Sequence, residues 1–197
     1  MNKTEFLIGR SGLDLLDDFY PDDLPNEWRF DYYSTLFKAL ALKIDTEEDL
    51  EQIFTELEDS DEVFELVISI EQAQLLDAAQ LASKLKPIYQ YRSQFNLFCE
   101  LDEQPSDKVM SILSDYQVCL QSNKKLKLDL NTKLIANKHL YFNQLPILYT
   151  SNVWDEKQIR NFLQDVSLIN TKTVLICKHA ESETLNKIRI IAEILGF

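Results

Sequence analysis

Acidic and basic side chains that could carry chemistry stand at the ends of two apolar segments. Glu100 and Asp102 end one such segment, and Lys178 and His179 follow another. Glu100 and Asp102 are two residues apart, so on an extended strand their carboxylates face the same side. Two carboxylates on one face can share protons in acid–base catalysis or bind a divalent cation, and His179 is a candidate general base. The alternative is an ordinary strand end and loop that emerge into solvent.

Other polar clusters lack the spacing of known metal or nucleotide sites. The acidic stretch near the N-terminus has neither the alternate-residue ligands nor the glycine of an EF-hand, so we expect a solvated loop. The two glycines near the N-terminus, in Gly9-Arg10-Ser11-Gly12, form neither a Walker loop nor a dinucleotide fingerprint. We assign His139 no role and expect no cofactor and no metal site. The aspartates of the acidic stretch are Asp14, Asp17, Asp18, Asp22 and Asp23.

Negative charge is concentrated in the first third of the chain. The net charge is −13, and residues 1–65 hold 19 acidic and 5 basic residues. Nucleic acid and anionic membranes need a cationic surface, so we expect neither as a partner. The excess charge indicates either a solvated acidic face that aids solubility or a docking patch for a basic protein.

The cysteines and the hydropathy bear on where the protein resides. Cys99, Cys119 and Cys177 each lie within an apolar run, so we expect buried free thiols rather than a disulfide or a metal site. No apolar run approaches the roughly 18 residues needed to cross a bilayer. The N-terminus lacks a basic region followed by an apolar one. These features predict a cytoplasmic protein.

Apolar runs alternate with amphipathic segments along one domain, residues 1–197. This order predicts a parallel sheet with right-handed crossovers. Eight strands is the number that closes a TIM barrel, with an open doubly wound sheet as the alternative. Residues 122–143, rich in lysine, are expected to form a long loop with short extended pieces. The expected strands are 5–9, 39–44, 64–70, 87–91, 95–101, 118–120, 145–150 and 173–178; the expected helices are 25–37, 46–57, 71–85, 106–116, 155–168 and 182–195.

The fourth and fifth expected strands are separated only by Arg92-Ser93-Gln94. A parallel connection normally needs about a dozen residues, so either the fourth strand is shorter or the pair is locally antiparallel. We therefore expect a compact or incomplete (β/α)8 barrel that lacks the helix between strands 4 and 5. Bare apolar strands usually mark an interaction site. The candidate partner-binding residues are Ile88, Tyr89, Phe95, Leu97 and Phe98.

A set of short motifs runs through the chain: Gly9-Arg10-Ser11-Gly12, Phe19-Tyr20-Pro21, Leu24-Pro25, Trp28, Tyr32-Tyr33 to Phe37, Leu85-Lys86-Pro87-Ile88-Tyr89-Gln90, Phe98-Cys99-Glu100-Leu101-Asp102, Leu145 to Asn152 and Thr173 to Leu195. Together they resemble the YecE-like family of unknown function, domain-of-unknown-function family seventy-two, whose members are TIM barrels. The similarity spans nearly the whole chain and is most specific near the N-terminus.

The resemblance implies a ligand site at the carboxyl ends of the strands, where barrel active sites are built. Its rim would include Arg10, Ser11, Gln90, Glu100, Asp102, Lys178 and His179. Several polar positions of the family are replaced here. Leu13 stands where the family has tryptophan, and Asp102 stands where it has arginine. These departures imply that an ancestral ligand site has decayed.

Two functions follow. The leading hypothesis is a non-catalytic, barrel-derived binding or scaffolding protein, a pseudoenzyme that docks a protein partner or a second copy over strands 4 and 5. The alternative is an enzyme of the hydrolase or lyase class that uses Glu100, Asp102 and His179 at the barrel mouth. A well-formed polar pocket around Glu100 would favour the enzyme.

Overall fold

The computed structural model describes residues 4–15 and 19–197. Within these residues the chain forms one mixed sheet with helices around it. The strands are β1 (Glu5–Ser11), β2 (Ala39–Lys43), β3 (Glu65–Ser69), β4 (Phe95–Leu101), β5 (Gln117–Ser122), β6 (Asn131–Ile135), β7 (Lys138–Phe142), β8 (Ile147–Thr150) and β9 (Lys172–Cys177). The helices are η1 (Asn26–Trp28), α1 (Arg29–Leu36), α2 (Leu50–Asp59), η2 (Gln72–Leu75), α3 (Ala78–Leu85), η3 (Lys86–Tyr91), α4 (Asp107–Leu113), α5 (Glu156–Ser167) and α6 (Ser182–Ile194), where η marks a 3-10 helix.

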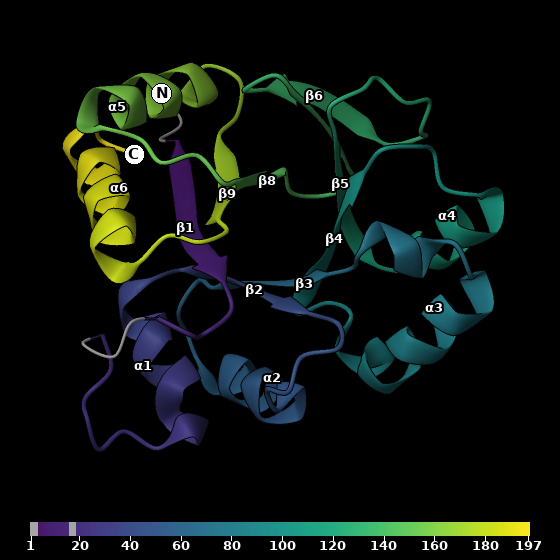
Figure 1. Cartoon of the computed structure of the whole chain (residues 1–197), viewed down its shortest axis with the longest axis horizontal. Coiled ribbons are helices and arrows are strands. Elements are labelled where there is room, and N and C mark those ends of the chain that lie inside the picture. The colour runs from purple at the N-terminus through teal and green to yellow at the C-terminus, as the bar shows by residue number, and fades with distance from the viewer. Residues whose placement is uncertain (1–3, 16–18) are drawn as a thin grey trace.

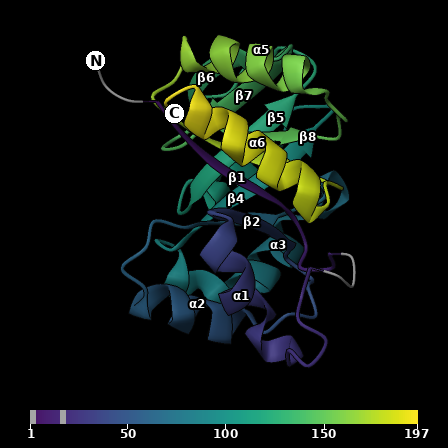
Figure 2. The same cartoon turned by 90° about the vertical axis from the view of Figure 1, so that its left-hand side faces the viewer.

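The strands form a nearly closed barrel, with the helices outside the ring (Figure 1). The strand order is β6-β7-β5-β4-β3-β2-β1-β9-β8. All pairs from β5 through β1 to β8 are parallel, and β6 and β7 pair antiparallel. Figure 2 shows α6 crossing the outer face of β1, with α5 beside it. The predicted incomplete TIM-barrel-like α/β fold is confirmed.

β1 and β2 approach closely at Gly9. This residue lies opposite Ala39 in the parallel register. A β-carbon placed at Gly9 would lie only 1.7 Å from the carbonyl oxygen of Ala39. Only glycine permits this approach, so Gly9 serves the barrel wall and not a phosphate loop.

Residues 87–91 do not form the predicted strand. They lie in η3, which continues α3 as a helical segment. Leu81, Leu85 and Ile88 are buried at helical spacing, which holds one side of this segment against the barrel. This packing outweighs the β propensity of the isoleucine and tyrosines. β4 therefore begins at Phe95, so the strand predicted at 87–91 is absent and no further crossover helix is needed before β4; the helix predicted at 106–116 is α4, which joins β4 to β5.

The face predicted to be uncovered is mostly buried within the protein. Phe95 packs against Phe54 of α2 and Tyr116 after α4, with ring centroids 5.6 and 6.0 Å apart. Among the five predicted residues, only Tyr89 keeps a large exposed fraction, 43%. The other four are buried: Ile88, Phe95, Leu97 and Phe98.

The barrel is instead interrupted after β5. Residues 122–143, expected to be a long loop, contain the hairpin β6–β7, and β7 pairs antiparallel with β5. Ala136 and Asn137 form the turn with φ angles of 49° and 62°. Positive φ at both central residues is typical of the two-residue type I′ turn. One β/α unit of a regular barrel is thus replaced by a hairpin.

The hairpin closes the side of the ring between α4 and α5 (Figure 1). The Lys133 ammonium of β6 donates to the carbonyl of Ile169, 2.7 Å away, and to the side-chain oxygen of Asn170. These two residues join α5 to β9. The lysine-bearing segment therefore covers the gap in the barrel.

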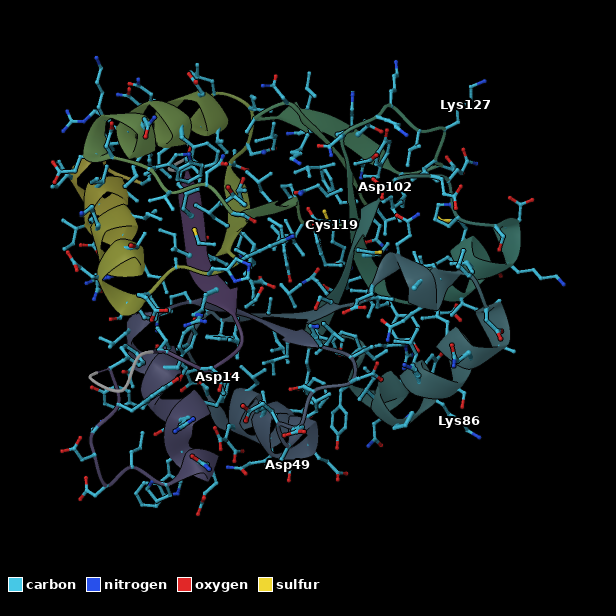
Figure 3. All side chains as sticks on the ribbon, in the orientation of Figure 1. Asp14, Asp49, Lys86, Asp102, Cys119 and Lys127 are labelled. Carbon is cyan, nitrogen blue, oxygen red and sulfur yellow. The ribbon has the colours of Figure 1, made fainter. Side chains whose placement is uncertain are left out.

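Two side chains of β5 replace the missing ladder to β8. The Gln121 side-chain amide donates to the Tyr149 carbonyl at 3.2 Å and accepts from the Tyr149 N–H at 3.0 Å. The Cys119 sulfur lies 3.3 Å from the Ile147 nitrogen, inside the ring between β5 and β8 (Figure 3). Buried backbone groups must be hydrogen-bonded. Cys119 and Gln121 thus supply hydrogen-bond partners for the backbone of β8 at Ile147 and Tyr149.

The thiols and the acidic stretch agree with the sequence predictions where the structure describes them. Cys99, Cys119 and Cys177 are free and buried, and burial raises the pKa of each thiol to about 12. Asp14, Asp22 and Asp23 are exposed, whereas Asp17 and Asp18 lie outside the described residues. Along residues 4–15 and 19–197, no helix has the length and apolar character to cross a membrane.

Candidate functional site

A cavity of about 560 Å³ opens at the carboxyl ends of the parallel strands. Strand ends contribute Ser11 from β1, Lys43 from β2, Ser69 from β3 and Tyr149 from β8. Its wall is mixed, with apolar side chains beside hydroxyl and charged groups. The volume lies in the usual range for small-molecule sites. The position is the one at which barrel enzymes build their active sites.

Glu100 and Lys178 meet across this mouth. Lys178 follows β9 and pairs with Oε2 of Glu100 on β4, although β3, β2 and β1 lie between these two strands in the sheet. The Gln121 side chain donates to Oε1 of Glu100 at 3.0 Å. Both carboxylate oxygens are therefore engaged, and the Glu100 side chain is held in place. Gln121 also hydrogen-bonds the backbone of β8 at Tyr149. One side chain therefore holds both the junction between β5 and β8 and the Glu100 carboxylate at the mouth.

Tyr149 is the functional candidate that sequence reasoning missed. Its ring stacks on Phe98 with centroids 3.8 Å apart and planes at 5°. Only 5% of Tyr149 is exposed, and its hydroxyl is fully buried beside the Ser11 and Ser69 hydroxyls. Burial raises the pKa of Tyr149 well above its ordinary range, against the opposing effect of these two serines. Tyr149 thus borders the cavity, and its neutral hydroxyl supports the two serines that line it.

A signal for Tyr149 existed in the sequence. A polar tip near the carboxyl end of a barrel strand is a site candidate by position alone. The residue type gave no further signal, because a tyrosine in an apolar strand is also an ordinary core residue. The stacking with Phe98 depends on β4 and β8 facing each other across the barrel interior, which the local sequence does not reveal.

The remaining groups at the mouth are exposed. Lys43 pairs with Glu71 at 3.0 Å, and both side chains are largely exposed. His179 follows Lys178 and borders the same cavity. Ser11, Glu100, Lys178 and His179, four of the predicted site residues, are therefore brought together around one cavity.

Arg10 and Gln90 do not line the cavity, contrary to the predicted rim. Arg10 is buried on the other face of β1, where its Nε donates to the Ser11 carbonyl and Nη1 lies 3.9 Å from Glu181. Gln90 is exposed on η3, which precedes β4 and so lies toward the opposite end of the barrel. The error for Gln90 follows from treating residues 87–91 as a strand with a carboxyl end at the mouth.

Asp102 lies just beyond β4 and borders a separate, smaller cavity of about 250 Å³. Glu100 and Lys138 also border it, and the Asp102 N–H donates to the side-chain oxygen of Gln72 at 2.7 Å. Glu100 therefore divides the two cavities, and Asp102 does not reach the larger one. Among residues 4–15 and 19–197, no group of three or more histidine, cysteine, aspartate or glutamate side chains could hold a metal ion.

The comparisons with known proteins bear on the fold alone. No protein-family model and no curated protein matches the chain. Among solved structures, the chain is similar to the crystal structure of a DUF72 family protein from Thermotoga maritima, with a TM-score of 0.60 and 11% sequence identity. The match covers 96% of this chain and 98% of the other. The chain shares the fold of the family that its sequence resembles.

Proposed function

We propose that the barrel mouth binds a small molecule. The observation that supports this most is the cavity of about 560 Å³ at the carboxyl ends of the strands, where the Ser11 and Ser69 side chains gather beside an apolar wall. A few converging polar groups in a largely apolar cavity are the usual composition of a small-molecule site. The Tyr149 hydroxyl lies beside Ser11 and Ser69, so it helps to orient the hydroxyls that a ligand would contact.

The rigidity of the site supports the same proposal. Phe98 stacks on Tyr149, and Gln121 fixes both the Tyr149 backbone and Glu100. A preformed site loses little conformational entropy when it binds a ligand. Phe98, Gln121 and Tyr149 belong to β4, β5 and β8, so the strands of the barrel themselves hold the side chains at the mouth.

A thermal-shift screen of small molecules tests the proposal, followed by calorimetric titration of each hit. The variant Tyr149→Phe removes only the hydroxyl, and we expect it to weaken binding by about tenfold. Tyr116→Phe is the matched control, because Tyr116 is also buried but lies away from the mouth. Hits that bind both variants with wild-type affinity, or the absence of any hit, would contradict the proposal.

Catalysis of the hydrolase or lyase class is the further step of this proposal. Because both oxygens of Glu100 are engaged, the group best placed to move a proton is the exposed His179. Histidine is the side chain that most often serves as a general base in enzymes. Turnover of an identified ligand that is lost in His179→Gln while binding persists would support this role; turnover that is unchanged would exclude it.

A protein-docking function has a second, separate basis. An open groove of about 580 Å³ lies between η3 and α4, lined by Pro87, Tyr89, Ile112 and Tyr116. Tyr89, one of the residues predicted to bind a partner, is 43% exposed there and packs edge-on against Tyr116. A partner that binds the wild type and Val63→Asp equally but loses Tyr89→Asp would support docking at this groove; equal binding to all three would oppose it. Val63 is an exposed apolar residue outside the groove.

A further inference from the structure

We infer that the ligand of the barrel mouth is an uncharged, hydroxyl-rich small molecule, such as a monosaccharide or a cyclic polyol. This inference rests on the proposed function, since it names the class of ligand for the same cavity. Three features of the cavity carry it: paired charges, hydroxyl groups that both donate and accept, and an apolar part of the wall.

The lysines at the mouth are already matched within the protein. Lys178 pairs with Glu100, and Lys43 pairs with Glu71. An anionic ligand would have to displace a carboxylate from one of these lysines. This exchange replaces one ion pair by another and still requires the ligand charge to leave water. An uncharged ligand disturbs neither pair.

The hydroxyl groups around the cavity offer both hydrogen-bonding roles. Ser69 donates to the Leu42 carbonyl at 3.2 Å, so its oxygen is left to accept. Thr46 accepts from the Glu48 N–H at 3.2 Å, so its hydrogen is left to donate. Ser11 contributes a third hydroxyl to the lining of the cavity. A ligand hydroxyl both donates and accepts, so it matches this mixture, whereas a carboxylate or phosphate can only accept.

The rest of the wall suits the C–H face of a saturated ring. Ala41, Leu42, Ile70 and Phe98 line the cavity beside the hydroxyl groups. Sugars and cyclic polyols combine a C–H face with a hydroxyl edge. Their size is compatible with a cavity of about 560 Å³. This combination separates them from purely apolar ligands, which would leave the hydroxyls and ion pairs unmatched.

Matched sugar pairs test the ligand class. Saturation-transfer NMR and calorimetry would compare D-glucose, D-galactose, D-mannose, D-xylose and myo-inositol with D-glucuronate, D-glucosamine and glucose 6-phosphate. We expect at least one uncharged compound to bind, its charged counterpart to bind at least tenfold more weakly, and Tyr149→Phe to weaken binding by about tenfold. Tyr116→Phe should leave the affinity unchanged.

The outcomes separate this inference from the proposed function. If a charged compound binds more tightly than its uncharged counterpart and depends on Tyr149, the ligand class is wrong and the mouth remains a small-molecule site. If binding of an uncharged compound is unaffected by Tyr149→Phe, the inference is also wrong. If no compound of the panel binds, the inference fails, and the wider thermal-shift screen decides the proposed function by itself.

Discussion

Replacing Gln121 by methionine should destabilise the barrel strongly, because Gln121 bridges β5 to β8. The side chain is 1% exposed and makes three hydrogen bonds, two to the Tyr149 backbone and one to Glu100. Methionine has a similar length and flexibility but cannot form them. The variant leaves one N–H and one carbonyl of β8 without partners.

The expected size follows from these orphaned groups. Each buried backbone group that loses its partner costs about 1–3 kcal/mol, so the two of Tyr149 together cost about 2–6 kcal/mol. Glu100 adds little, because its side chain is 44% exposed and water can replace the amide. Urea denaturation measures the difference as a lower transition midpoint at an unchanged slope.

Gln117→Met provides the matched control on the same strand. Gln117 donates one hydrogen bond, to the Ser93 carbonyl at 3.1 Å, in an exposed setting. We expect this variant to lose about 1 kcal/mol or less. If Gln121→Met stays within about 1 kcal/mol of Gln117→Met, the role assigned to the β5–β8 bridge is wrong.

Three further predictions concern the barrel wall, the hairpin and the thiols. Gly9→Ala should lower the melting temperature by many degrees or prevent folding, because its β-carbon would overlap the Ala39 carbonyl; an unchanged melting temperature would contradict the close approach of β1 and β2. Lys133→Ala should speed hydrogen exchange in β6 and β7, since it removes the bonds to Ile169 and Asn170, whereas exposed Lys125→Ala should not; equal exchange in both variants would argue against the anchor. Stability should fall as pH rises from about 9 toward 12, because the buried thiols have a pKa of about 12 and the unfolded chain releases these protons near pH 9; a flat urea midpoint over pH 8–11 would oppose this.

The barrel class could be predicted from the sequence, because parallel strands buried on both faces have continuous apolar sequences. Residues 39–44, 64–70 and 173–178 each read in this way and correspond to β2, β3 and β9. Segments with helical periodicity lie between these strands, and this alternation of strand and helix predicts a parallel sheet. These signals are local, so they survive in a single sequence.

The interruption of the barrel could not be placed by the same signals. Residues 87–91 carry β-forming side chains, yet Ile88 continues the buried helical face of Leu81 and Leu85. The hairpin turn at Ala136 and Asn137 lacks the glycine that usually marks such turns. Tertiary packing decided both segments, and it shifted the irregular part of the ring from strand 4 to the segment after β5.

The candidate site was predicted in part. Strand ends indicated Ser11, Glu100, Lys178 and His179, because polar residues that follow barrel strands must meet at one end of the ring. Tyr149 and Gln121 escaped notice, since their roles depend on contacts between β4, β5 and β8 that are far apart in sequence. The same long-range contacts make the mouth a rigid cavity.

NMR titration of the labelled protein with its tightest small-molecule hit tests the small-molecule site most directly. We expect shift changes that saturate with ligand and centre on Ser11, Ser69, Tyr149 and Lys178, with intermolecular contacts to the Tyr149 ring. Saturable changes that centre on Tyr89 and Tyr116 at the outer groove, with none at the barrel mouth, would contradict the account.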